Sequence, residues 1–197
     1  MAVEIVQLEH VPSSYRIHLA LFRNVKNAGF LHQQLLARNA DFEYAFIDAS
    51  TIVSRFHLLS AVFKAVNNSV NGTLRTPNVH SEIVVSLSSS SNIADAYRRF
   101  GVSPSTSDLF VVKVTFPSDT TPEPPSAESI SQHLRDNVEG DAVPATDEAI
   151  QTITDVRTVR KSYKLNGLAW LDAIKDELVK RQEIERLIVG GMALRGV

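Results

Sequence analysis

The sequence contains no cysteine among its 197 residues. This absence excludes thiolate nucleophiles, cysteine-ligated zinc, iron–sulfur clusters and disulfides, and it fits a reducing compartment. Long apolar runs are also missing, because runs such as residues 109–112 fall far short of the roughly 20 residues that span a bilayer. The first ten residues alternate and carry Glu4, Glu9 and His10, unlike a signal peptide. We therefore expect a soluble intracellular protein with no membrane partner.

Charge of one sign does not dominate the whole chain. The formal net charge is −2, from 20 basic and 22 acidic residues, so the total gives no case for nucleic acid. Residues 119–155, however, hold nine acidic residues against Arg135 alone, a net of −8, so the remainder, with 19 basic and 13 acidic residues, carries +6. An acidic segment thus balances a mildly basic body.

Hydrophobic periodicity predicts both strands and helices. Because these elements do not alternate strictly and the chain begins with a hairpin, we predict one α+β domain over residues 1–197, with a largely antiparallel central sheet flanked by helices. A Pro-rich acidic loop region is expected around residues 117–146, and a helix or tail after residue 178. The predicted strands are residues 3–8, 15–22, 45–48, 79–87 and 109–116. One predicted helix begins at residue 28. The other predicted helices cover residues 54–71, 92–100, 126–137, 146–154, 155–164 and 168–189.

Local signatures of catalysis are absent. The sequence has no Walker A loop, Rossmann glycine fingerprint, HExxH or GxSxG. The six histidines show no metal-ligand spacing, and His18 and His80 are expected at surface or half-buried strand positions. The pair Gly190-Gly191 is interpreted as a frayed tail rather than a ligand loop. We therefore predict no catalytic or metal-ligating residue, no cofactor, and a protein that is not an enzyme.

A basic stripe has a directed physical interpretation. Its members fall at helical spacing along about one and a half turns and could bind successive phosphates, or they could form a solvated face that complements the acidic segment. Arg98 and Arg99 have a similar pair of interpretations, because cations at the end of a helix also stabilise its dipole. The stripe consists of Arg157, Arg160, Lys161 and Lys164.

Three segments together resemble one family. They are residues 21–29, residues 80–87 continuing through 91–101 into 109–112, and residues 155–165. In this order and spacing they resemble the TPRKB-like family, the kinase-binding small subunit of the KEOPS (EKC) complex. The chain departs from the family at residues 88–91, where serines replace a proline and asparagines, and in a longer segment at 117–146. From these departures we expect a fungal member.

The resemblance implies a non-catalytic subunit that binds and supports the atypical kinase/ATPase of KEOPS, and reaches the other subunits through it. It also implies help in binding tRNA at its 3′ CCA end for threonylcarbamoyladenosine modification at position 37, with telomere and transcription roles. The expected location is the nucleus and cytoplasm, including telomeres.

Candidate contact residues follow from these implications. An apolar helix surface would dock the kinase, and the basic residues would hold tRNA. Two alternatives remain open: a stand-alone RNA-binding module, and a small metal-free enzyme with a histidine base. The kinase-binding candidates are Ile93, Tyr97, Leu168 and Leu171. The tRNA-binding candidates are Arg157, Arg160, Lys161, Lys164, Arg98 and Arg99.

Overall fold

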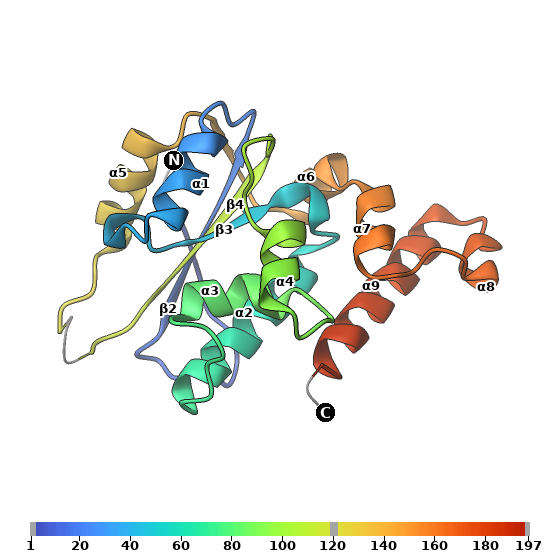
Figure 1. Ribbon diagram of the computed structural model, residues 1–197, viewed down its shortest axis with the longest axis horizontal. Helices are drawn as coiled ribbons and strands as arrows, with labels where there is room; N and C mark the ends of the chain where they lie inside the picture. Colours follow the sequence, from blue (N-terminus) through green and yellow to red (C-terminus); the bar gives the residue numbers. More distant parts are fainter. Residues whose placement is uncertain (1–2, 119–121, 196–197) are drawn as a thin grey trace.

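A computed structural model describes residues 3–118 and 122–195 of the chain. Its centre is an antiparallel sheet with the order β1-β2-β4-β3, and β5 also pairs with β2 (Figure 1). Helices flank this sheet, so the predicted α+β class with an antiparallel sheet is confirmed. The strands are β1 (Glu4–Val6), β2 (Arg16–Arg23), β3 (Ala45–Asp48), β4 (Leu109–Thr115) and β5 (Asp141–Val143).

Two short strands share one edge of β2. β1 pairs with residues 17–19 of β2, and β5 pairs with residues 21–23. The sequence predicted the hairpin of β1 and β2 but not β5, which lies inside the region expected to be loop. Three residues are too few to show alternation, so only pairing with β2 defines this strand.

The helices pack on both faces of the sheet. On one face, α1 and α5 cover Phe22, Phe46 and Leu109; the other face, with Leu19 and Phe110, meets α2, α3, α7 and α9 (Figure 1). The helices are α1 (Ala28–Leu36), α2 (Arg55–Val70), α3 (Val79–Ser86), α4 (Ile93–Phe100), α5 (Ala127–Asn137), α6 (Asp147–Ile153), α7 (Val156–Ser162), α8 (Ala169–Asp172) and α9 (Glu177–Ala193). Short 3-10 turns lie at Ala40–Phe42 and Ala49–Thr51.

Helix α3 corrects the prediction of a strand at residues 79–87. The side chain of Asn78 accepts a hydrogen bond from the Ser81 N–H at 2.8 Å and begins a helix there. Contacts with α2, α4, β3 and β4 surround α3, and most of its residues are buried. A helix enclosed in this way shows no polar stripe, so its sequence could be mistaken for an alternating strand.

The C-terminal region is also different from the prediction. The single helix expected at residues 168–189 is divided into α8 and α9, with Asp176 capping α9 through hydrogen bonds from Leu178 N and Val179 N. Gly190 and Gly191 lie inside α9 and do not form a frayed tail. Helix α9 packs on α2, where Lys64 Nζ donates to Met192 O at 2.7 Å.

No helix in the described ranges, 3–118 and 122–195, is long and apolar enough to cross a membrane.

Candidate interaction surface on helices α4, α7 and α8

Helix α4 presents an apolar and basic outer face. It begins after Asn92, whose Oδ1 accepts from Asp95 N at 2.9 Å, so Asn92 is the N-cap, whereas the sequence predicted a helix that includes residue 92. Ala96 and Phe100 are buried beneath the helix. Ile93 is 40% exposed, whereas Tyr97 is half-buried. A protein partner would therefore meet Ile93 first.

Arg99 joins α4 to α7. Its Nη1 donates to Ser162 O at 2.7 Å, at the C-terminal end of α7, and its Nε lies 2.7 Å from Asp95 Oδ2. Arg98 also pairs with Asp95, but its side chain remains 77% exposed. The fold thus brings the basic candidates of α4 and α7 to one region. Arg98 is exposed to a binding partner, whereas the hydrogen bonds of Arg99 hold α4 against α7.

Helix α7 divides its basic stripe in the same way. Arg160 is only 19% exposed, pairs with Asp172 at 2.6 Å and donates to Leu165 O at 3.2 Å, so it ties α7 to α8. Arg157, Lys161 and Lys164 are exposed. Within the described ranges none of these three makes an ion pair with the acidic segment. The Asp155 carboxylate, which caps α7, acts on Arg157 through its charge, so the acidic segment offsets this surface only at its first cation.

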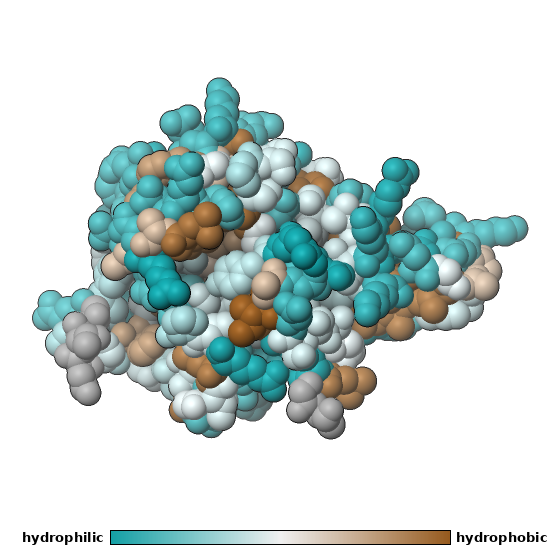
Figure 2. Space-filling view, viewed as in Figure 1, coloured by the Kyte–Doolittle hydropathy of each residue, from teal (hydrophilic) through white to brown (hydrophobic). Residues whose placement is uncertain are grey.

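The apolar candidates of α8 separate clearly. Leu171 is fully buried in the core and is not available as a surface contact, whereas Leu168 is half-buried. Sequence reasoning missed Trp170, which is 49% exposed, and the exposed pair Leu178 and Val179 at the start of α9. The chain has one tryptophan, and that rarity was the available signal. In Figure 2 hydrophilic side chains cover α7 beside hydrophobic ones along α9.

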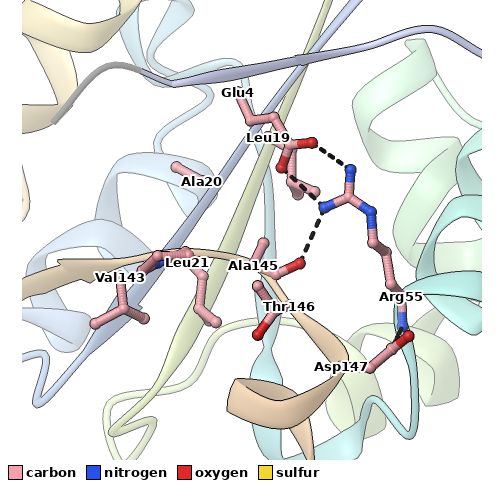
Figure 3. A pocket seen from close by; sticks show the side chains of 10 residues that line it. Glu4, Leu19, Ala20, Leu21, Arg55, Val143, Ala145, Thr146 and Asp147 are labelled. Carbon is pink, nitrogen blue, oxygen red and sulfur yellow. Dashed lines mark hydrogen bonds and ion pairs between the residues drawn. The ribbon is translucent and has the colours of Figure 1, made fainter.

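A cleft of about 640 Å³ lies on another part of the molecule (Figure 3). Arg55 Nη1 donates to Glu4 Oε2 at 2.8 Å and to Ala145 O at 2.9 Å, while its backbone N–H donates to Asp147 Oδ1 at 2.7 Å. Arg55 forms an ion pair with Glu4, and the three contacts join β1 to α2 and to the segment that begins α6. The ten residues that line the cleft include no histidine, and so no general base of that type.

The histidines are more buried than predicted. His18, His57 and His80 are 2%, 0% and 5% exposed, which corrects the surface or half-buried placement of His18 and His80. His80 Nε2 accepts from Val114 N at 3.0 Å, and His18 Nε2 lies 3.1 Å from Thr115 Oγ1. Both rings thus contact the end of β4, and burial lowers the pKa of each.

Within residues 3–118 and 122–195, no group of three or more histidine, aspartate or glutamate side chains is placed to hold a metal ion.

Comparison with known proteins decides the family. The profile described as "Kinase binding protein CGI-121" matches residues 22–196. The chain belongs to the CGI-121 family. The kinase-binding family predicted from three sequence segments is thereby confirmed.

Relatives of this CGI-121 family chain match it along its length. It is 66% identical over 197 residues to "EKC/KEOPS complex subunit CGI121" of Gibberella zeae, with both chains fully covered. It is 48% identical over 207 residues to the corresponding subunit of Neurospora crassa, again with full coverage. The subunit of Yarrowia lipolytica is 37% identical over 180 residues, covering 91% of this chain and 94% of the relative.

Proposed function

We propose that this protein is a non-catalytic subunit of an EKC/KEOPS complex and binds its atypical kinase/ATPase directly. The observation that carries the proposal is 66% identity over the full length to a relative named as such a subunit. The matching family is described as kinase-binding, which gives the direct partner. Other subunits of the complex are reached through the kinase.

The exposed apolar side chains of α4, α8 and α9 supply a docking face. Ile93 projects from α4, and Trp170 from α8. Leu178 and Val179, at the start of α9, are two more exposed apolar side chains. Tryptophan is enriched among residues that dominate interface energies, because it buries a large rigid surface. We therefore place the kinase contact on these helices.

Affinity purification of the tagged protein from its own cells tests complex membership. The kinase and the threonylcarbamoyl-transfer subunit are expected to co-purify. Recovery of the tagged protein with neither of these two subunits would overturn the proposal.

Two variants test the docking face with purified kinase. Ile93→Asp and Trp170→Asp each introduce a charge at an exposed apolar position, so each is expected to weaken kinase binding about tenfold or more. Leu36→Asp is the matched control, because Leu36 is 71% exposed at the end of α1. Equal kinase affinity for all three variants would remove the docking face from α4 and α8.

We propose further that the exposed cations help the complex to bind tRNA at its 3′ CCA end for threonylcarbamoyladenosine modification at position 37. The support is a group of exposed cations on and just after α7, none of which forms an ion pair in the part of the chain that the structure describes, in the region of Arg98 of α4. Cations so placed release counterions when they meet phosphates.

Charge reversal tests this RNA surface. The double variant Arg157→Glu, Lys161→Glu is expected to weaken tRNA binding by the assembled complex and to lower the slope of log affinity against log salt by about 2. Lys26→Glu, an exposed cation before α1, is the control. An unchanged salt slope in the double variant would contradict the proposal.

The same measurement separates the alternatives. Tight tRNA binding by the isolated chain, lost in the double variant, would favour a stand-alone RNA-binding module instead. The alternative of an enzyme with a histidine base is disfavoured for His18, His57 and His80. These three side chains are buried, and each makes a hydrogen bond to another protein group.

A nuclear and cytoplasmic location, with telomere and transcription roles, completes the proposal. A fluorescent fusion and chromatin immunoprecipitation at telomeric repeats would test it. Exclusion of the fusion from the nucleus would contradict the telomere and transcription roles.

A further inference from the structure

The serine loop between α3 and α4 lies against the end of the chain. Ser88 is buried, while Ser89, Ser90 and Ser91 are exposed. A Cβ placed on Gly191 of α9 would lie 3.6 Å from the Ser89 Cβ. The carbonyl of Ser88 accepts a hydrogen bond from Arg195 Nη1 at 3.4 Å. Ser89 is therefore an exposed serine that directly follows a carbonyl bound by the Arg195 guanidinium.

Arg195 has donors to spare at this place. Its Nη1 also donates to Val85 O, at the C-terminal end of α3. Its Nε is buried and has no hydrogen-bond partner among the residues that the structure describes. A guanidinium carries five N–H donors in a fixed fork that suits bidentate binding of phosphate. An anion at Ser89 would give the unused donors an acceptor.

Two more cations surround Arg195. Lys64 Nζ donates to Arg195 O at 3.2 Å, and the backbone N–H of Arg75 donates to Glu82 Oε2 at 3.0 Å. Burial lowers the pKa of Lys64, and the positive charges of Arg195 and Arg75 lower it further. The three cations are thus close enough to repel one another. The Arg75 side chain is exposed, so it can turn toward an anion.

The carboxylates nearby do not neutralise this cluster. Glu82 is 1% exposed, and its oxygens already accept hydrogen bonds from Asn68 Nδ2, Arg75 N, Thr76 N and Thr76 Oγ1. On α4, Asp95 pairs with Arg98 and Arg99. Among the residues that the structure describes, one carboxylate, that of Glu82, acts on these three cations, which leaves an excess of positive charge at the loop.

We propose that Ser89 is a phosphorylation site and that Arg195, supported by Arg75 and Lys64, binds the phosphate and ties the loop at residues 88–91 to the end of α9. A phosphoserine opposite an arginine cluster forms charge-assisted hydrogen bonds that order a loop. An intramolecular occupant is favoured over RNA because Arg195 already bonds the carbonyl of the preceding residue, Ser88, and Ser89 packs next to Gly191 of α9.

The modification is an ordinary phosphoryl transfer from ATP by a protein kinase. The Ser89 oxygen forms a bond to the γ-phosphorus as the bond to ADP breaks, and the hydroxyl proton passes to the base of the kinase. The modified loop leads directly into α4, which carries Ile93 and Tyr97. Binding of the phosphate would therefore hold the N-terminal end of α4, and with it the proposed kinase-docking residues, in place. Only this regulatory effect rests on the proposed function.

Phosphoserine installed at position 89 during translation tests the capture in the isolated full-length chain. Ser13, which is exposed in the loop between β1 and β2, is the control position. The phosphate at Ser89 is expected to titrate by phosphorus NMR about one pH unit below the phosphate at Ser13, because adjacent cations favour the dianion. Equal titration at the two positions would overturn the capture, whatever the kinase-binding result.

Variants assign the phosphate ligands. Arg195→Gln and, separately, Arg75→Gln are each expected to move the titration of the Ser89 phosphate toward that at Ser13. Arg75→Gln keeps the backbone hydrogen bond to Glu82, so the test survives if Arg195→Gln fails to fold. No movement in either soluble variant would overturn the assignment.

Mass spectrometry of the protein from its own cells tests the modification itself. Phosphate at Ser89 is expected. Modification only at Ser90 or Ser91, or none, would overturn the site. Loss of tRNA binding by the unmodified Arg75→Gln variant would assign the cluster to RNA and likewise overturn the proposal.

Discussion

His57 has its proton position determined by its neighbours. Tyr163 donates its hydroxyl proton to Leu87 O at 2.6 Å, so the Tyr163 oxygen accepts from His57 Nε2 at 2.8 Å. The other ring nitrogen, Nδ1, faces the Val53 N–H at 3.4 Å and is the acceptor. His57 is therefore the neutral tautomer with its proton on Nε2. This chain of hydrogen bonds joins α2, the end of α7 and the end of α3.

Acid is expected to destabilise the protein through this histidine and His80. Burial lowers the pKa of each to about 3, against 6.5 in an unfolded chain. Because the unfolded state binds the extra protons, stability is complete above pH 6.5 and falls as the pH drops toward 3, by up to about 1.4 kcal/mol per pH unit for each group. Urea unfolding between pH 7 and 5 measures this slope.

His57→Gln should reduce that slope by the share of one histidine, since glutamine keeps a donor but does not titrate. His32→Gln on α1 is the control. An unchanged slope in His57→Gln would mean that the pKa of His57 is the same in the folded and unfolded protein.

Tyr163→Phe should lower the free energy of unfolding by about 1–3 kcal/mol, because the buried His57 N–H and Leu87 carbonyl lose their partner. Tyr15→Phe is the matched control, since Tyr15 stacks on Phe116 and this ring contact is retained. Chemical denaturation at pH 7.5 measures both. Equal stability of the two variants would mean that the hydrogen bonds of Tyr163 with His57 and Leu87 do not stabilise the protein.

At the scale of elements, prediction succeeded for α2, which buries one face and exposes the other, and for β3, which is short and almost fully buried. Residues 45–48 were predicted as a strand with the observed bounds, and α2 differs by one residue at each end. The sequence failed at α3, because burial on all sides removes the polar stripe that distinguishes a helix. The prediction of Leu171 as a surface contact was wrong because residues 168–189 were expected to form one helix. The break between α8 and α9 determines which face of α8 is buried, and the sequence did not predict that break.

The glycines at helix ends differ in what a side chain would meet. A Cβ on Gly190 has nothing within 4 Å, whereas a Cβ on Gly101 would lie 2.7 Å from Tyr97 O. Gly190→Ala should therefore raise the free energy of unfolding by about 0.5–1 kcal/mol, the helix propensity difference. Gly101→Ala should lower it. Urea midpoints test both, and destabilisation by Gly190→Ala would mean that α9 is not helical at this position.

At the scale of the whole molecule, α9 completes the larger core. Ile184, Ile188 and Met192 are buried against it. Ile188→Ala should cost about 2–5 kcal/mol, because it leaves a cavity in packed surroundings. Leu194→Ala, at a position 71% exposed, should change stability by less than about 0.5 kcal/mol. Equal thermal midpoints would show that the last helix is dispensable.

The candidate surface could be predicted only in part. Arg157 and Lys161, four residues apart on α7, are both exposed, but the stripe does not continue as helix to Lys164, because α7 ends at Ser162. The spacing also did not indicate that Arg160 would turn to Asp172. That ion pair depends on the position of α8, which no local pattern specifies. Trp170 was missed for the same reason, because its exposure follows from tertiary packing.

The shared edge of β2 has a consequence for evolution. The chain leaves the sheet at the end of β4 and forms α5. It then returns to the sheet as β5, which pairs with β2. The connection between β4 and α5 is thus closed at both ends by fixed elements, and doubling such a loop costs only about 0.6 kcal/mol. Insertions and deletions should collect there while the register of every strand stays unchanged.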